Sequence, residues 1–304
     1  MKEDEEIIMK KIGIHNGTFH ADDVFCIALM QSLYGEVEVV RTRDQKLLDE
    51  CDIVADVGNG KYDHHDVEKK VRENGIPYCA FGLLWQDYGV EYVKTQFPSV
   101  TDESEQKEIA DKIDSNFIQQ IDANDNGVDV MQSEVPITTL SEIIKSYVPF
   151  GGTEEDVEKS FFEAVEFAKM ILFRKTKKYA EHYNNLRLIQ AEIEKQDVDN
   201  THMLVLENSV PWKDAVLEFD KEEKILFVVY PNITGSWCVQ TTLKDKDSFA
   251  ARKDLPKSWG GLRDDDLSRE TGINDCVFCH PALFICGNKT KEGAIKMAQA
   301  AVLN

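Results

Sequence analysis

Histidine and aspartate residues gather in four short segments near the start of the 304-residue chain. Four of the seven histidines fall within the first 65 residues. The segments are residues 15–23 (HNGTFHADD), Asp56 before Gly58, residues 63–65 (DHH) and residues 122–127 (DANDNG). Carboxylate and imidazole groups are the ligands that Mn²⁺, Mg²⁺ and Co²⁺ take for phosphate chemistry. The four segments therefore predict a site for divalent metal ions.

Hydrolysis of a phosphodiester bond explains these residue types. It needs a hydroxide nucleophile at neutral pH and neutralisation of the charge on the phosphoryl oxygens. Two metal ions about 3.5–4 Å apart supply both, and a carboxylate must bridge them. No cysteine lies in the four segments, which argues against a structural zinc site. We predict two divalent ions, with Mn²⁺ favoured over Mg²⁺ and Co²⁺.

Each segment taken alone has a simpler interpretation. Asp22 could cap the helix that follows it, and Asp56 could be a turn residue before glycine. Adjacent histidines at a strand end rarely serve packing, so residues 63–65 point more specifically to a site. All four segments in one α/β domain, each at the expected edge, favour a metal site.

The elements that must position these residues follow an alternating pattern. Strands are predicted at 11–14, 37–41, 52–57 and 62–63, and helices at 22–34, 79–90 and 105–121. This alternation predicts an α/β fold, a parallel sheet with helices on both faces. Ligands of such sheets bind at the carboxyl ends of the strands, where the histidines and aspartates fall.

The rest of the chain predicts two further parts. A long helical stretch without proline or glycine covers 154–196. Beyond it, strands are predicted at 203–207, 215–219, 225–230, 236–242 and 282–286, with a last helix at 291–303. We therefore predict a metal-binding catalytic α/β domain at 7–153, a helical connector at 154–200 and a smaller α+β substrate-binding domain at 201–304.

Composition limits the function. The net charge of −21 argues against broad electrostatic binding of nucleic acid, although Lys244–Arg263 is locally basic. Seven cysteines, an odd number with irregular spacing, predict reduced thiols. No apolar run approaches a membrane span, and the acidic N-terminus is unlike a signal peptide. We expect an intracellular protein, cytoplasmic or nuclear, with no membrane partner.

Two further motifs carry weaker hypotheses. Residues 276–280 (CVFCH) match the haem attachment pattern, and the same cysteines could join Cys238 or Cys286 around zinc. Both are poorer interpretations than reduced thiols, because haem attachment needs export and the match is short. Residues 122–127 imitate the start of a calcium loop, but position 12 would be Ser133, so the bidentate ligand is missing.

The ordered motifs resemble those of a known family over nearly the whole chain. The pattern of residues 13–22, then Asp56, Asp63-His-His and a late Asp resembles the DHH phosphoesterase superfamily, which includes RecJ-like exonucleases and family II inorganic pyrophosphatases. With Trp259-Gly-Gly-Leu-Arg-Asp264 and Gly287-Asn-Lys-Thr290, the chain is more similar to the Myg (melanocyte-proliferating-gene) family, described as 3′-to-5′ RNA exonucleases. The resemblance implies that activity, with single-stranded RNA or a short oligonucleotide as the substrate.

The resemblance also implies roles for single residues. One metal would be held by His15, His20 and Asp56, and the other by Asp22, Asp56, His64 and a late aspartate. Asp125 is favoured as that late ligand and Asp122 is the alternative. The bridging Asp56, His64 and a phosphate-binding His65 would form the catalytic group. His20 stands where most of the superfamily has aspartate, so less negative charge is expected at the site.

The C-terminal domain would bind the rest of the substrate. Trp237 could stack on a base or pack as a core residue of a strand, and the sequence supports the two roles equally. Arg263, His280 and Lys289 are candidates for phosphate contacts.

Two other functions compete with the exonuclease. One keeps the metals and takes a small phosphorylated substrate such as pyrophosphate, a cyclic dinucleotide or a nucleotide, which the acidic net charge favours. The other is a non-catalytic regulatory protein stabilised by metal. A homodimer through the long helix is a further hypothesis.

Overall fold

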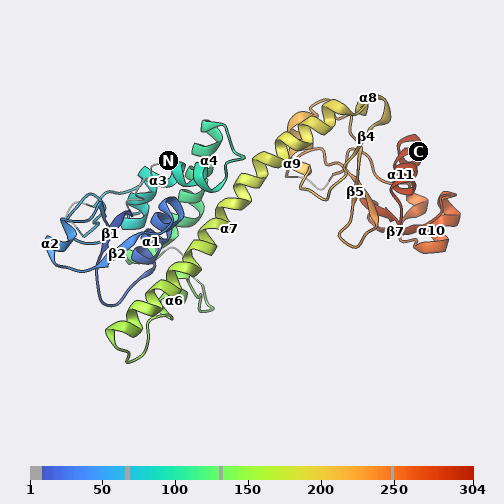
Figure 1. The fold of residues 1–304 in the computed structure, drawn as a ribbon. Coiled ribbons are helices and arrows are strands. Elements are labelled where there is room, and N and C mark those ends of the chain that lie inside the picture. The colour runs from blue at the N-terminus through green and yellow to red at the C-terminus, as the bar shows by residue number, and fades with distance from the viewer. Residues whose placement is uncertain (1–8, 66–68, 130–132, 248–249) are drawn as a thin grey trace, which may run out of the picture. The chain divides into compact units, whose positions relative to one another are not determined.

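A computed structural model describes residues 9–65, 69–129, 133–247 and 250–304. The chain divides into two compact units, and the division falls between Glu181 and His182, inside the long helix α7 (Glu154–Lys195) (Figure 1). Each unit has its own sheet, which confirms the predicted two-domain α/β fold. The finer three-part division at 153 and 200 stays a prediction. Within the described residues, no helix combines the length and apolar character that crossing a bilayer requires.

The N-terminal unit is built on a small parallel sheet. Its strands are β1 (Lys11–Ile14), β2 (Glu38–Arg41) and β3 (Ile53–Val54), in the order β2-β1-β3. Gly13 of the central strand is crowded, since a Cβ there would lie 3.0 Å from Leu48 and 3.2 Å from Val54. The three strands run the same way, so the segments after β1 and β3 leave the same edge. That edge carries the predicted site.

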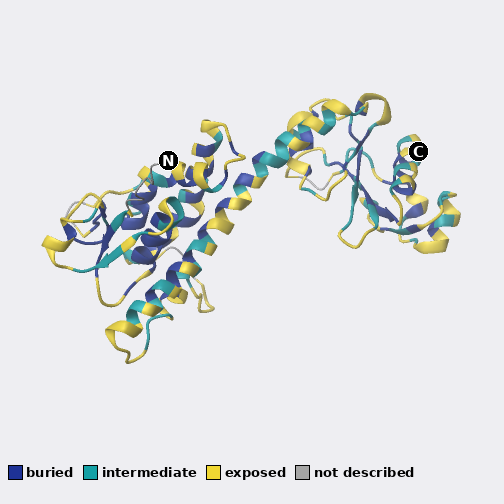
Figure 2. Cartoon of the chain, viewed as in Figure 1, coloured by how far each residue is buried: buried dark blue, intermediate teal, exposed yellow. Residues whose placement is uncertain are grey.

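Helices cover this sheet and hold its loops. They are α1 (Ala21–Tyr34), α2 (Gln45–Leu48), α3 (Ala80–Gln96), α4 (Glu103–Ile113), the π-helix η1 (Asp114–Ile118), α5 (Gln119–Asp125) and α6 (Leu140–Lys145). Ten successive residues of α1, from Ala21 to Met30, are buried, and α3 packs on it (Figure 2). A helix buried on all sides is a fixed support, so the acids in its first turn are held firmly.

Several predicted boundaries of this unit were wrong. Residues 62–63 form no strand, because Tyr62 makes only one isolated bridge, to Ala55. The third strand is two residues long rather than six. The helix predicted at 105–121 is interrupted by η1 and continues as α5 to Asp125, so Asp122 lies inside a helix and Asp125 ends it.

Helix α7 matches the predicted long helix almost to the residue. It begins with a capping box, in which Thr153 N donates to Asp156 and Asp156 N donates to the Thr153 hydroxyl, at 2.8 and 3.2 Å. Its first part packs on the N-terminal unit, where Phe173 stacks on Phe97 with ring centroids 5.1 Å apart. Its last part enters the second core through Ile189. A homodimer through this helix stays a prediction.

The C-terminal unit contains a mixed five-stranded sheet. The strands are β4 (Met203–Val205), β5 (Phe227–Pro231), β6 (Trp237–Thr241), β7 (Cys276–Cys279) and β8 (Ile285–Asn288), in the order β4-β5-β6-β8-β7. The helical elements are α8 (Val198–Thr201), α9 (Lys213–Phe219), η2 (Lys257–Trp259), α10 (Asp264–Thr271) and α11 (Lys291–Leu303). Helix α11 contacts β5, β6 and β8, and the core between them includes Phe227, Val239 and Met297.

Two predictions for this unit were wrong, and two of its elements were missed. Residues 215–219 form helix α9 rather than a strand, because the adjacent Ala215 and Val216 are both buried, which strand alternation forbids. Strand β7 and helix α10 were not predicted. The strand expected at 282–286 begins at Ile285, since the residues before it form the turn of the β7–β8 hairpin.

Candidate metal centre

The predicted histidines and aspartates meet at the carboxyl edge of the N-terminal sheet. His15 directly follows β1, and Asp56 follows β3 after one residue. Asp22 lies in the first turn of α1, while His64 comes from the loop between β3 and α3. All four side chains are buried, with at most 9% of any residue exposed. Sequence-distant polar groups buried together need a reason beyond packing, because isolated burial is costly.

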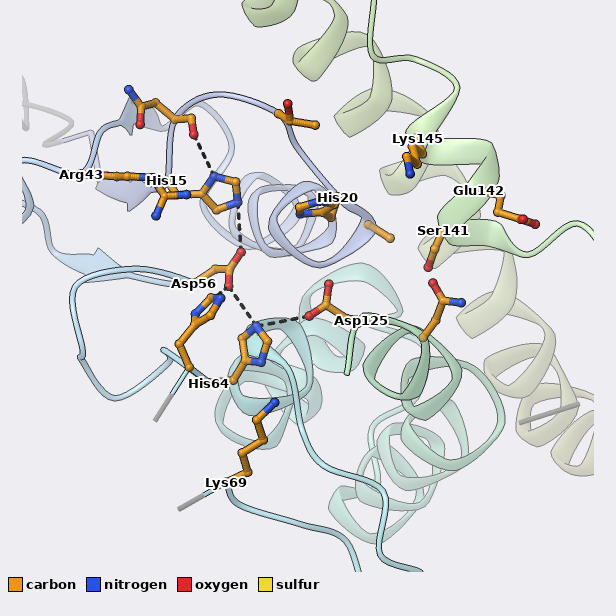
Figure 3. A pocket seen from close by; sticks show the side chains of 15 residues that line it. His15, His20, Arg43, Asp56, His64, Lys69, Asp125, Ser141, Glu142 and Lys145 are labelled. Carbon is orange, nitrogen blue, oxygen red and sulfur yellow. Dashed lines mark hydrogen bonds and ion pairs between the residues drawn. The ribbon is translucent and has the colours of Figure 1, made fainter. Parts of the chain in front are cut away.

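Asp56 occupies the centre of the cluster. Its φ is +57°, a left-handed conformation that aspartate tolerates better than most residues. Its two carboxylate oxygens face different histidines: Oδ2 lies 3.2 Å from His15 Nε2, and Oδ1 lies 3.1 Å from His64 Nε2 (Figure 3). The carboxylate therefore stands between two imidazole rings.

His64 faces three carboxylates at once. Its Nε2 lies 3.1 Å from Asp56, 3.2 Å from Asp125 Oδ2 and 3.5 Å from Asp22 Oδ2. Two sets of three side chains could each hold a metal ion: Asp56 with His64 and His65, and Asp22 with His64 and Asp125. Donor atoms about 3 Å apart fit a shared coordination sphere, because metal–oxygen and metal–nitrogen bonds are roughly 2.0–2.2 Å long.

His15 is oriented by its own loop. Its Nδ1 lies 3.0 Å from the Asn16 carbonyl, which can only accept, so Nδ1 carries the proton and Nε2 faces the carboxylates. A histidine that donates one ring N–H to a carbonyl presents the other nitrogen as a metal ligand. Beside Asp56, this Nε2 also lies 3.3 Å from Asp23 Oδ2.

Asp23 also belongs to this buried cluster, although the sequence motifs did not single it out. The side chain is fully buried, and its Oδ1 accepts from the backbone N–H of His20 at 2.7 Å and of Val24 at 3.0 Å. Its Oδ2 accepts no hydrogen bond from the described residues. The signal was present, since Asp23 adjoins Asp22, but an acid in the first turn of a helix is ordinarily a cap.

His20 and His65 lie differently from His15 and His64. His20 is exposed at the start of α1, with its ring centroid 6.1 Å from that of His15, and it belongs to neither set of three. The His65 side chain is 62% exposed and its Nδ1 lies 2.7 Å from Asp63 Oδ1. The Asp63 carboxylate therefore accepts a hydrogen bond from Nδ1–H and leaves Nε2 of His65 available to a ligand.

Asp122 and Asp125, the two candidates for the last metal ligand, contact different groups. Asp125 faces His64, whereas Asp122 pairs with Arg72 at 2.5 Å and accepts from the Cys79 thiol at 2.7 Å. Asp122 also packs on Gly82, where a Cβ would lie 2.2 Å from its Oδ2. Asp122 thus contacts Arg72 and Cys79, next to the cluster, rather than His64.

Cys79 joins Asp122 to the site. Its thiol lies 2.8 Å from Asp22 Oδ1 as well as 2.7 Å from Asp122 Oδ1. The same Asp22 carboxylate accepts from the backbone N–H groups of Ala80 and Phe81, at 3.1 and 2.6 Å, at the start of α3. Asp22 is therefore held on one side by a helix N-terminus and a thiol, and its Oδ2 points toward His64.

The pKa shifts show an excess of buried negative charge. Burial raises the pKa of Asp22 and Asp125, and nearby carboxylates raise it further. Burial raises the pKa of Asp23 to about 7 against the opposing charge of His15. Burial also opposes the ionised form of Asp56, but contacts with His15 and His64 outweigh it and lower its pKa to about 2. A bound cation would favour the ionised form of these carboxyl groups.

The chain is similar to known proteins over nearly its whole length. The MYG1 exonuclease family model, described as an uncharacterised protein family (UPF0160), matches residues 11–302. The mouse MYG1 exonuclease is 32% identical over 323 residues, which cover 96% of this chain and 84% of the mouse protein. The human MYG1 exonuclease is 31% identical, with 96% and 85% covered, and a fission yeast (Schizosaccharomyces pombe) MYG1 protein is 29% identical, with 96% and 97% covered. This chain belongs to the MYG1 exonuclease family.

Membership of the MYG1 exonuclease family covers both units, so the C-terminal candidates matter too. Trp237 begins β6 half-buried, with Lys291 Nζ 5.5 Å from its ring centre. Arg263, His280 and Lys289 are exposed. Lys289 directly follows β8, whereas His280 lies at the turn of the β7–β8 hairpin, at the other end of that strand. The structure therefore does not bring Lys289 and His280 together.

Proposed function

We propose that this member of the MYG1 exonuclease family is a metal-dependent phosphodiesterase, an exonuclease that shortens single-stranded RNA from the 3′ end. The observation that carries the hydrolytic part is the position of Asp56, whose two oxygens face His15 and His64. A carboxylate so placed can serve two cations. The names of the mouse and human relatives support nuclease activity. RNA, polarity and kinship with the DHH superfamily rest on the sequence motifs.

The residues present fit divalent ions. Two buried oxygens, Asp23 Oδ2 and Asp56 Oδ1, accept no hydrogen bond from the described residues, although each lies within 3.3 Å of an imidazole nitrogen. His15, Asp23 and Asp56 would hold one ion, and Asp22, Asp56, His64 and Asp125 the other, with Mn²⁺ preferred for this mixed oxygen and nitrogen set. When bound, such ions lower the pKa of water and neutralise phosphoryl charge.

The protein's own groups would position the substrate. Asp63 fixes the ring of His65 through Nδ1, so that in the protonated imidazolium form Nε2 can donate a hydrogen bond to a phosphate oxygen in the pocket. Lys69, which also lines the pocket, adds positive charge near His64. The buried carboxylates stay fixed because α1 and α3 hold Asp22 and Asp23 by backbone N–H groups.

The test is cleavage of a 5′-labelled short single-stranded RNA with Mn²⁺, with Mg²⁺ and with EDTA. We expect a ladder that shortens from the 3′ end, disappears in EDTA and is absent from His64→Ala. His182→Ala, a histidine of the C-terminal unit, is the matched control and should cleave like the wild type. Absence of cleavage in every lane would overturn the nuclease proposal.

A small phosphorylated substrate is the second candidate. The pocket over the cluster has a volume of about 680 Å³, within the roughly 300–1,000 Å³ range of small-molecule sites. Phosphate release from pyrophosphate, measured beside nucleotide release from RNA, separates the two. Faster turnover of pyrophosphate would favour the second candidate.

A further inference from the structure

Basic side chains surround the acidic floor of the pocket. Arg43, Lys69 and Lys145 line the same cavity as His15 and Asp56. They belong to different segments, since Arg43 follows β2, Lys69 precedes α3 and Lys145 ends α6. Figure 3 shows Arg43 beside His15 and Lys145 on the opposite side of the pocket. The cations therefore approach the cluster from separate directions.

Two of these cations, Arg43 and Lys145, differ from the third in their surroundings. Among the described residues, the side chains of Arg43 and Lys145 make neither an ion pair nor a hydrogen bond, whereas Lys69 Nζ donates to Asn126 Oδ1 at 2.6 Å. Both are exposed, in a chain whose net charge of −21 offers many acidic partners. Unpaired cations on the rim of one pocket are well placed for an anionic ligand.

Lys145 is carried by a firmly anchored helix. Helix α6 begins with a capping box, where Thr139 N donates to Glu142 Oε2 at 2.8 Å and Glu142 N donates to the Thr139 hydroxyl at 3.2 Å. Ile144 is fully buried, and α6 packs against α1 and α5. The Glu142 carboxylate accepts from the backbone N–H of Thr139, and among the described residues it makes no ion pair with Lys145. The ammonium group of Lys145 can therefore contact a ligand.

We propose that Arg43 and Lys145 bind non-scissile phosphates, so that the preferred substrate is an oligonucleotide with phosphates beyond the one that is cut. This inference rests on the proposed phosphodiesterase function. The two cations lie on opposite sides of the pocket and would therefore contact different phosphates. A dinucleoside monophosphate, which has only the scissile phosphate, would leave both unused. Arg43 suits bidentate contact, while Lys145 acts as a point charge.

Two measurements test the proposal. The first is the ratio of kcat/KM for a tetranucleotide to that for a dinucleoside monophosphate, with Mn²⁺. Arg43→Met and Lys145→Met should each lower this ratio about five- to tenfold, the scale of a partly exposed charged contact. The second is binding of a fluorescein-labelled phosphorothioate tetranucleotide over a salt series. Each variant should weaken Kd about five- to tenfold and reduce the salt slope by about 0.7, the value for one phosphate of a single strand.

Matched controls separate these subsites from general charge. Lys94→Met removes an exposed lysine outside the pocket and should change neither measurement. Glu142→Gln keeps the cap, removes an acid and should tighten binding slightly. An unchanged ratio and unchanged Kd in both methionine variants would overturn the proposal while leaving the phosphodiesterase intact. Binding that depends on Arg43 and Lys145 in a protein that cuts no phosphodiester would keep the phosphate subsites and remove the hydrolytic function.

Discussion

Both units gather residues that bind metals in other proteins, but their surroundings are opposite. In the N-terminal unit, buried carboxylates and imidazoles converge, and one oxygen each of Asp23 and Asp56 accepts no hydrogen bond from the part of the chain that the structure describes. In the C-terminal unit, Cys276, Cys279 and Cys286 are buried among apolar side chains of the sheet and α11. In the described part of that unit, no three ligand atoms come close enough to hold a metal.

The difference teaches that strand ends, rather than residue types, mark the site. His15 and Asp56 follow the carboxyl ends of parallel strands, where loops converge. Cys279 and Cys286 are instead paired directly across β7 and β8, so they lie inside an antiparallel ladder. Burial raises the pKa of both thiols, which keeps them protonated and suited to packing.

The largest expected loss of activity distinguishes two aspartates that share a left-handed backbone conformation. Asp56 and Asp275 both have left-handed conformations, with φ of +57° and +64°, and asparagine tolerates that region equally well. Asp56→Asn removes a charge between two histidines and should lower kcat/KM on RNA more than about a hundredfold, beyond the usual loss from an outer partner. Asp275→Asn, in the exposed turn between α10 and β7, should change it less than about twofold. Comparable losses in the two variants would refute the proposed centre.

The sequence predicted the parts of the site that depend on local pattern. The turns after β1 and β3 pointed to His15 and Asp56 at strand ends, and the pair of adjacent histidines pointed to His64, although no strand forms at residues 62–63. Asp23 was missed because its role depends on how α1 docks, which no local pattern records. His20 was included because the resemblance placed it at a ligand position, yet its side chain is exposed.

The C-terminal unit shows the same limit for the fold. Strand β7 was not predicted because Cys276 and Cys279, three residues apart, are both buried, which breaks strict alternation. A register shift between Cys276 and Phe278 accounts for this pattern. Such irregularities arise from tertiary packing. The long helix α7, by contrast, was predicted closely, because forty-two residues without a breaker leave little choice.

A smaller effect should separate two buried cysteines. Cys79→Ala removes the thiol that contacts Asp22 and Asp122, and should weaken Mn²⁺ binding roughly 10–100-fold, as loss of an outer partner does. Cys286→Ala truncates a fully buried thiol in the second core and should lower stability by roughly 0.5–3 kcal/mol without altering Mn²⁺ affinity. Calorimetric titration measures the Mn²⁺ affinity of both variants. Cys79→Ser should recover part of the lost affinity because the serine hydroxyl keeps a hydrogen-bond donor. Equal Mn²⁺ affinity in the two alanine variants would show that Cys79 only fills space.

The smallest effect is a dependence on pH that changes sign with metal. Burial alone would lower the pKa of His15 and His64, but the contacts with Asp56 and the neighbouring carboxylates raise both above the ordinary value. A histidine whose pKa is higher in the folded state stabilises the protein fully when the pH lies below its pKa in the unfolded chain. This contribution is lost as the pH rises through its pKa in the folded chain. Burial raises the pKa of Asp23 to about 7, so Asp23 also costs stability as the pH rises toward 7, because the folded chain keeps a proton that the unfolded chain has lost. The metal-free N-terminal unit should therefore lose stability between pH 6 and pH 8.

Mn²⁺ should reverse this trend, since each imidazole must lose its proton before it binds a metal. Mn²⁺ affinity should then rise with pH by up to about tenfold per unit for each proton released. Hydrogen exchange of α1 and of β8, measured at pH 6 and pH 8 with and without Mn²⁺ and corrected for the intrinsic rate, reads the two units separately. Protection of α1 should increase with Mn²⁺ more at pH 8 than at pH 6, while β8, far along the chain among buried thiols, should not respond. An equal response of α1 at both pH values would mean that His15 and His64 do not exchange protons for metal, and the cluster would then be a buried ion network like any other.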